Sequence, residues 1–156
     1  MIEAHDLFEA HLTVTDLDEA IRFYRDVVGL TLAHVTDTRQ AAFFWIGSRG
    51  HAMLGVWLAG ESPLKISSHL AFRADLADVL AAPEMLRAAG ITPLGFDGRP
   101  TDCPDVLAWM PAAAVYFRDP AGHLLEYIAM LPQKPCSASV VLPWPVWEEM
   151  HASARI

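Results

Sequence analysis

Cysteine and basic side chains are scarce in this chain of 156 residues. Its two cysteines, Cys103 and Cys136, form neither a disulfide framework nor a metal-ligand motif, so we expect reduced thiols in a cytoplasmic protein. Lysine and arginine together number 11, against 19 acidic residues, and the formal net charge is −8. No basic cluster is available to neutralise phosphates, which excludes nucleic acid as an expected partner.

Long apolar runs are absent too. The longest, from Val106 to Phe117, is interrupted by Pro111 and is far shorter than the roughly 20 residues that a membrane-crossing helix needs. The first residues have no basic region and no long apolar run, so we expect no signal peptide and no membrane partner. A hydrophobic fraction of 53% is explained by a full core alone or, as we favour, by a core plus a buried subunit interface.

One pattern, a strand followed by a helix and three strands, is written twice in the sequence. In the first copy, polar and apolar residues alternate over 7–14, and Asp16 and Gly29 mark the two ends of a helix. In the second copy, Asp75 begins a helix that ends at Gly90, and Pro83 is expected to kink it. The remaining strands are predicted over residues 31–37, 40–46, 51–58, 67–73, 92–96, 112–118 and 123–130.

Each copy alone would leave one face of its sheet exposed, so the two should pack together. We therefore predict an α+β domain over residues 1–131, made of two paired βαβββ modules (about 7–59 and about 67–131). Their sheets should curl around a shared cavity, and the helices should cover the outer faces, including Phe8, Leu12, Leu70 and Phe72. Residues 132–156 should form a C-terminal arm with a short helix near 146–152, packed on its own domain or on a partner subunit rather than serving as a lid.

His11 and His69 occupy equivalent positions of the repeat, on the side of each strand that should face the cavity. Glu126 lies in the apolar last strand, where an ionised carboxylate is costly unless a cation neutralises it. An ion pair with Arg22, Arg73 or Arg118 is one explanation, but it leaves both histidines without a role. Two imidazoles and a carboxylate suit an open site for Mn, Fe(II), Co, Ni or Zn better than one for Mg or Ca.

Four segments resemble the vicinal-oxygen-chelate superfamily, which includes glyoxalase I, fosfomycin-resistance transferases, extradiol dioxygenases and bleomycin-resistance proteins. They are the opening His11-Leu-Thr-Val, the helix over 20–30, His69-Leu-Ala-Phe, and the ending over 117–126 with its Asp-Pro-Ala-Gly turn. The resemblance covers about residues 7–131. It implies His11, His69 and Glu126 as ligands of one divalent metal, and a homodimer with each site shared between subunits.

The resemblance also identifies residues around the metal. Thr13, Trp57 and Tyr116 match substrate-contacting positions of the fosfomycin-resistance transferases, and we expect Thr13 and Tyr116 to act in catalysis. Trp57 stands where glyoxalase I has a fourth, carboxylate ligand, and the charges that bind a phosphonate are missing, so neither activity is expected. The wall of the cavity for a small-molecule substrate is predicted to consist of Trp57, Trp109, Tyr116 and Phe44.

The leading hypothesis is a divalent-metal-dependent enzyme that chelates adjacent oxygens of a small substrate and then promotes proton transfer, thiol addition or oxygen insertion. The sequence does not distinguish among these reactions. The competing hypothesis is a metal-independent binding protein of the bleomycin-resistance type, which would sequester a small molecule or drug by shape.

Overall fold

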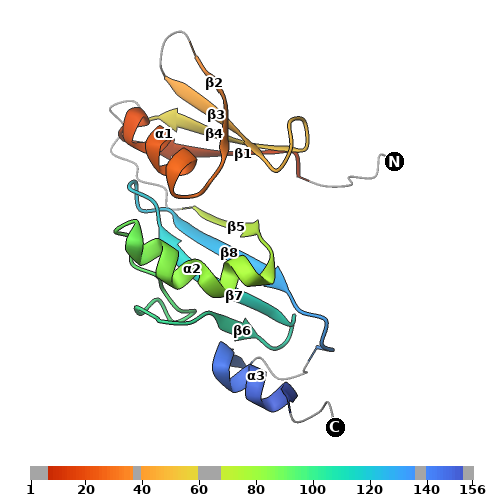
Figure 1. The fold of residues 1–156 in the computed structure, drawn as a ribbon. Helices are drawn as coiled ribbons and strands as arrows, with labels where there is room; N and C mark the ends of the chain where they lie inside the picture. Colours follow the sequence, from red (N-terminus) through yellow and green to blue (C-terminus); the bar gives the residue numbers. More distant parts are fainter. Residues whose placement is uncertain (1–6, 37–39, 60–67, 136–139, 153–156) are drawn as a thin grey trace. The chain divides into compact units, whose positions relative to one another are not determined.

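A computed structural model describes residues 7–36, 40–59, 68–135 and 140–152 of the chain. Two compact units make up the fold (Figure 1). The first comprises residues 1–68 and 119–123, and the second comprises residues 69–118 and 124–156. The predicted strand ends at Asp37 and Ser67, like Cys136, lie outside the described residues.

The first unit is a βαβββ module with one mixed, open sheet. Its sheet order is β1-β4-β3-β2, in which β1 runs parallel to β4 and the other neighbours are antiparallel. The elements are β1 (Glu9–Val14), α1 (Leu17–Asp26), β2 (Thr31–Val35), β3 (Ala41–Ile46) and β4 (Ala52–Leu58).

Apolar and polar side chains alternate between the two faces of β1, as predicted. Leu12 and Val14 are buried, whereas Glu9, His11 and Thr13 are exposed. Phe8 departs from the prediction: it precedes β1 and is 50% exposed, so the helix does not cover it.

Helix α1 begins where the sequence predicts. The Asp16 side chain accepts a hydrogen bond of 2.9 Å from the backbone N–H of Glu19, which satisfies one of the free donors at the helix start. The helix then buries Leu17, Ala20, Phe23 and Tyr24.

The second unit repeats this plan and adds a strand. Its sheet order is β5-β8-β7-β6-β9, again with the first strand of the module parallel to the last. Because β5-β8-β7-β6 matches β1-β4-β3-β2, the predicted duplication and the α+β, βαβββ fold class are confirmed, with open sheets that carry helices on one side. The elements are β5 (His69–Arg73), α2 (Leu76–Ala88), β6 (Asp105–Leu107), β7 (Ala112–Arg118), β8 (Leu124–Met130), β9 (Val141–Pro143) and α3 (Trp144–Ala152).

The strand predicted over residues 92–96 is wrong. Only Leu94 pairs there, through isolated bridges to Tyr116 and Pro100, and the strand of this part of the module is β6. Gly95 donates its N–H to the carbonyl of Arg99 at 2.8 Å, and Gly98 has φ of 76°, so the chain turns tightly instead of extending. Helix α2 runs through Pro83.

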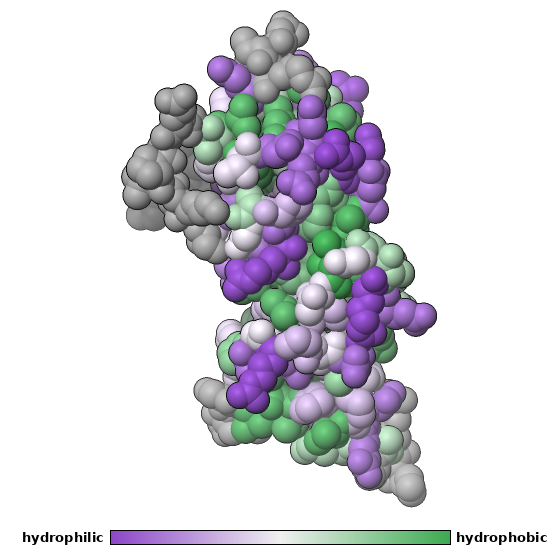
Figure 2. All heavy atoms as spheres, turned by 90° about the vertical axis from the view of Figure 1, so that its left-hand side faces the viewer, coloured by the Kyte–Doolittle hydropathy of each residue, from purple (hydrophilic) through white to green (hydrophobic). Residues whose placement is uncertain are grey.

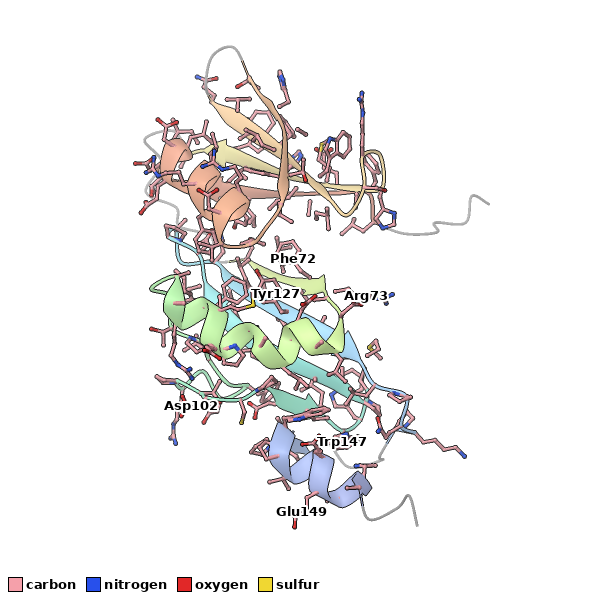
Figure 3. All side chains as sticks on the ribbon, in the orientation of Figure 1. Phe72, Arg73, Asp102, Tyr127, Trp147 and Glu149 are labelled. Carbon is pink, nitrogen blue, oxygen red and sulfur yellow. The ribbon has the colours of Figure 1, made fainter. Side chains whose placement is uncertain are left out.

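Residues 140–152 are part of the second unit and pack within it. Strand β9 pairs with β6, and α3 begins at Trp144, two residues before the predicted helix. Pro145 lies in the first turn, where its missing N–H removes no helical hydrogen bond. Trp147 points from α3 toward the sheet, whereas Glu149 points away from it (Figure 3).

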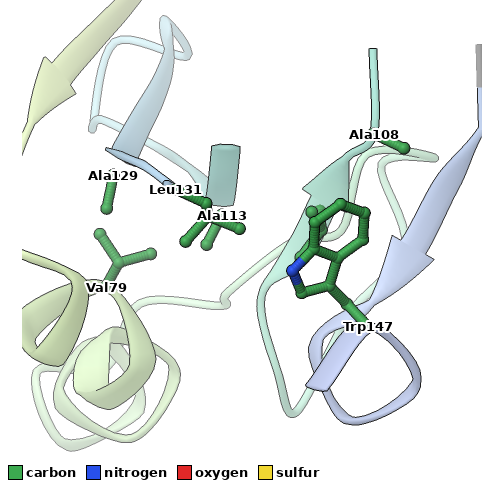
Figure 4. Packing of buried hydrophobic residues seen from close by; sticks show 7 residues of the cluster. Val79, Ala108, Ala113, Ala129, Leu131 and Trp147 are labelled. Atoms are coloured by element: carbon green, nitrogen blue, oxygen red, sulfur yellow. The ribbon is translucent and has the colours of Figure 1, made fainter. Parts of the chain in front are cut away.

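A buried cluster fixes α3 in this place. Trp147 is 4% exposed and packs with residues of α2, β6, β7 and β8 (Figure 4). These residues are Val79, Val106, Ala108, Ala113, Ala129 and Leu131. In the view of Figure 2, hydrophilic and apolar side chains are interspersed over the surface of each unit. Within the described residues, no helix is long and apolar enough to cross a membrane.

Candidate functional site

The two histidines predicted as metal ligands take equivalent places in the two units. His11 lies on β1 and His69 on β5, each the strand that runs parallel to the last strand of its module. Their side chains are 49% and 51% exposed, respectively. On the opposite face of each strand, Leu12 and Phe72 are buried, and Leu70 is partly buried.

In the second unit, His69 meets the predicted carboxylate. The register of β5 and β8 pairs Ala71 with Glu126, and His69 Nε2 lies 3.0 Å from Glu126 Oε2. Glu126 is 4% exposed. Burial raises the pKa of its carboxyl, while the neighbouring His69 and Tyr116 act in the opposite direction.

The second carboxylate oxygen of Glu126, the buried Oε1, makes no hydrogen bond with any of the described residues. A buried, unsatisfied carboxylate oxygen is costly, and a bound cation would remove that cost. The arrangement therefore fits a metal ligand.

Tyr116 lies beside this pair on β7, directly opposite Glu126 in the strand register. Its ring centroid is 6.0 Å from that of His69. Burial, followed by the negative charge of Glu126, raises the pKa of the Tyr116 hydroxyl above its ordinary value. Tyr116 therefore keeps its proton at neutral pH and can donate it to a hydrogen bond.

In the first unit, His11 has a carboxylate neighbour that the sequence analysis did not single out as a site residue. His11 Nε2 lies 3.1 Å from Glu9 Oε1 on the same strand. The imidazole lies across Gly55 of β4, where an added Cβ would come within 2.6 Å of His11 Cδ2. Gly55 thus provides the space that the ring occupies.

Aromatic side chains surround His11. The ring of Trp57 is 5.7 Å away and that of Phe43 is 6.2 Å away, and these two rings meet edge to face. Trp57 is 41% exposed and pairs in register with Thr13, which is also exposed. The structure therefore brings together His11, Thr13 and Trp57 on one face of the first sheet.

Phe44 does not share this face. It is fully buried on the helix side of β3, with its ring 5.8 Å from that of Tyr24. Phe43, which pairs with Gly55, is the residue of β3 that lies on the face of His11. Trp109 is 53% exposed and precedes β7. Strand β7 begins four residues before Tyr116, which is roughly 13 Å along the strand. Trp109 lies beyond that end of the strand. The structure does not bring Trp109 to His69.

His34 is a further residue of this face that the sequence analysis did not single out. The strand registers align His11, Gly55, Phe43 and His34 in one row across the sheet. The rings of His34 and Phe43 are stacked at 6.4 Å. The register of β2 shifts between Leu32 and His34, so strand alternation alone does not predict this placement.

His123 has a structural role in the first unit. It is 2% exposed, its Nδ1 accepts a hydrogen bond from the Ser68 N–H, and its Nε2 donates to the Thr13 carbonyl. Asp119 accepts hydrogen bonds from the Tyr24 hydroxyl and from the His123 N–H. Burial, and then the charge of Asp119, raises the pKa of Tyr24.

The described residues contain no group of three or more metal-ligating side chains. Instead, the described part of each unit carries a histidine–carboxylate pair, His11 with Glu9 and His69 with Glu126. Imidazole nitrogen and carboxylate oxygen are donors that suit Zn and the divalent ions of Mn, Fe, Co and Ni. The duplicated βαβββ modules give this protein the vicinal-oxygen-chelate fold.

The chain belongs to the glyoxalase/bleomycin resistance protein/dioxygenase superfamily, whose sequence model matches residues 6–127. An integron cassette protein from the mobile metagenome of the Halifax Harbour sewage outfall is 26% identical, with a TM-score of 0.69 over 81% of this chain and 100% of that one. Lactoylglutathione lyase from Agrobacterium tumefaciens is 27% identical, with a TM-score of 0.61 over 81% of this chain and 94% of its own.

A fosfomycin resistance protein from Mesorhizobium loti shares the fold. It is 21% identical, with a TM-score of 0.54 over 85% of this chain and 96% of that one. Enzymes therefore occur among the structural neighbours, and this family membership makes enzymatic activity the natural hypothesis to test.

Proposed function

We propose that the protein is a divalent-metal-dependent enzyme that acts on a small substrate through two adjacent oxygens. The observation that carries the proposal is the buried Glu126, which has one oxygen beside His69 and the other without a partner among the described residues. His11 on β1 occupies in the first module the place that His69 on β5 occupies in the second. We propose these three residues as ligands of one Fe, Mn, Ni, Co or Zn ion.

The bound metal would act as a Lewis acid on oxygens of the substrate. Tyr116, which keeps its proton at neutral pH, would donate a hydrogen bond where negative charge develops. Thr13, exposed on β1, would offer a hydroxyl to the substrate, while Trp57 and Phe43 would exclude water from the first sheet's face.

The comparisons support this class without naming the reaction. A lactoylglutathione lyase and a fosfomycin resistance protein are both neighbours. Trp57 takes the position in β4 that corresponds to Glu126 in β8, because Thr13 pairs with Trp57 as Ala71 pairs with Glu126. The carboxylate that glyoxalase I carries there is absent, so we propose a substrate other than that of glyoxalase I.

Metal content tests the proposal. Protein purified without added metal should carry about one ion per chain, measured by atomic emission, or should bind one at micromolar concentration. His69→Ala and Glu126→Gln should each lose it, while the control Glu84→Gln, which removes an exposed carboxylate on α2, should retain it.

A wild-type protein that binds no metal would contradict the proposal and favour metal-independent sequestration. The specific observation behind that second candidate is the exposed aromatic face made by Trp57, Phe43 and His34, which suits a flat, apolar ligand. In that case a planar aromatic drug should bind the metal-free protein, and Trp57→Ala should abolish binding.

A further inference from the structure

Glu9 stands two residues before His11, so both side chains project from the same face of β1. Glu9 Oε1 lies 3.1 Å from His11 Nε2, and the two side chains are 35% and 49% exposed. The carboxylate therefore meets the ring nitrogen on the open face of the sheet, where an ion could reach both.

This pair repeats the geometry of His69 and Glu126. The same ring nitrogen, Nε2, faces the carboxylate in both units, at 3.1 Å in the first and 3.0 Å in the second. Metal–nitrogen and metal–oxygen bonds of 2.0–2.2 Å place adjacent ligands of an octahedral ion about 3 Å apart, and those of a tetrahedral ion about 3.4 Å apart. Both pairs match the octahedral spacing.

The strand registers explain why the carboxylate of the first unit comes from β1. In the second unit it comes from β8, at the position paired with Ala71. The corresponding position of the first unit holds Trp57, whose ring packs against His11 at 5.7 Å. Glu9 supplies on the neighbouring strand the carboxylate that β4 lacks.

We propose that Glu9 is a fourth protein ligand of the metal, beside His11, His69 and Glu126. The inference rests on the proposed function. Two carboxylates would neutralise the charge of a divalent ion, and four protein ligands would leave two positions of an octahedral ion for a bidentate substrate or for water.

The other explanation of the pair is a hydrogen bond from His11 to Glu9. In that case Nε2 carries the proton and is not free to bind a metal through the same atom. The two explanations therefore predict different effects of removing the Glu9 charge on the affinity for metal and on the coordination of the bound ion.

The experiment measures the dissociation constant of Co(II) by competition with a chelating dye, together with the visible spectrum of the Co(II) protein. Glu9→Gln should weaken binding about 100-fold and change the spectrum, because a water replaces a charged ligand. Glu84→Gln, which removes an exposed charge from α2, should change neither.

A rescue variant separates ligation from a general effect of charge. Glu9→Gln combined with Trp57→Glu places a carboxylate at the position that corresponds to Glu126, and it should recover about 10-fold or more of the lost affinity. Because Trp57 is 41% exposed, its replacement leaves no core cavity.

Two outcomes would overturn the inference. One is that Glu9→Gln binds Co(II) within about 2-fold of wild type, with the same spectrum, while Glu126→Gln loses the metal. The other is that Glu9→Gln weakens binding with an unchanged spectrum and without rescue, which would make Glu9 a positioning residue. A wild-type protein without metal affinity would instead contradict the proposed function itself.

Discussion

At the scale of single residues, Gly55 controls where His11 can lie. A Cβ at position 55 would lie 2.6 Å from His11 Cδ2 and 2.9 Å from His11 Nε2. Gly55→Ala should therefore displace the imidazole and weaken metal binding about 10-fold or more, measured by chelator competition. Far-ultraviolet circular dichroism should stay unchanged, since β4 has no strained φ at this position.

A double-mutant cycle provides the control. Measured by urea denaturation, Gly55→Ala should destabilise the wild-type chain but not a His11→Ala background, because the ring that it displaces is gone there. An equal loss of stability in both backgrounds would show that Gly55 acts on the sheet rather than on His11.

Tyr127 gives a second prediction at this scale. Burial raises the pKa of its hydroxyl from 10.0 to about 12. Between these values the unfolded chain ionises Tyr127 while the folded chain keeps the proton, so the stability that this group contributes is present below pH 10 and falls as pH rises toward 12. Tyr127→Phe should reduce the decline in the free energy of unfolding over this range, measured by urea denaturation.

Tyr24 and Tyr116 also have raised pKa values, so a smaller decline should remain in the Tyr127→Phe variant. An unchanged slope in this variant would contradict the assignment to Tyr127.

At the scale of elements, helix α3 should unfold together with the second unit. Trp147 is 4% exposed within the cluster that contains Val79 and Val106. Trp147→Ala should destabilise the protein by about 3–5 kcal/mol in urea denaturation. Met150→Ala on the same helix, where Met150 is 58% exposed, should cost about 0.5 kcal/mol or less.

Trp147→Phe should cost less than Trp147→Ala, because a phenyl ring fills part of the space that the indole leaves. Both variants remove the indole N–H, which is buried without a partner among the described residues. If Trp147→Ala were as mild as Met150→Ala, α3 would not belong to the cooperative core.

Sequence patterns predicted the elements that have their own boundary signals. Asp16 and Gly29 mark the ends of the first helical segment, and the alternation along β1 places His11 opposite Leu12. Strand β6 was missed because it has three residues, too few for a detectable period. Phe43 and Phe44 could not be told apart, since both faces of β3 are apolar and only the pairing with Gly55 shows which face meets His11.

The residues of the candidate site were also predicted only in part. The internal repeat predicted the correspondence of His11 with His69. The correspondence of Trp57 with Glu126 became visible only from the strand registers. The contact between Glu9 and His11 depends on side-chain conformations that strand alternation does not specify.

At the scale of the whole molecule, we predict a homodimer whose metal sites are shared between subunits. The prediction is tested by mixing two variants that should each lose the metal, His11→Ala and Glu126→Gln, after unfolding and refolding them together. In a shared site, each mixed dimer regains one intact set of ligands, so about a quarter of the wild-type metal content should return.

If each site forms within one chain, mixing should restore no metal. Light scattering of the wild-type protein should give twice the chain mass of 17.2 kDa, and a monomeric mass would contradict the dimer directly.

Because of the turn between β7 and β8, the two units of the duplicated fold are not two continuous segments of the chain. Residues 119–123 belong to the first unit although both flanking strands belong to the second. There they provide Asp119 for the Tyr24 hydroxyl and His123 for the Thr13 carbonyl. A gene fragment that ends at residue 68 would encode a half-protein without either partner, so the ancestral repeat can no longer be recovered by a single cut.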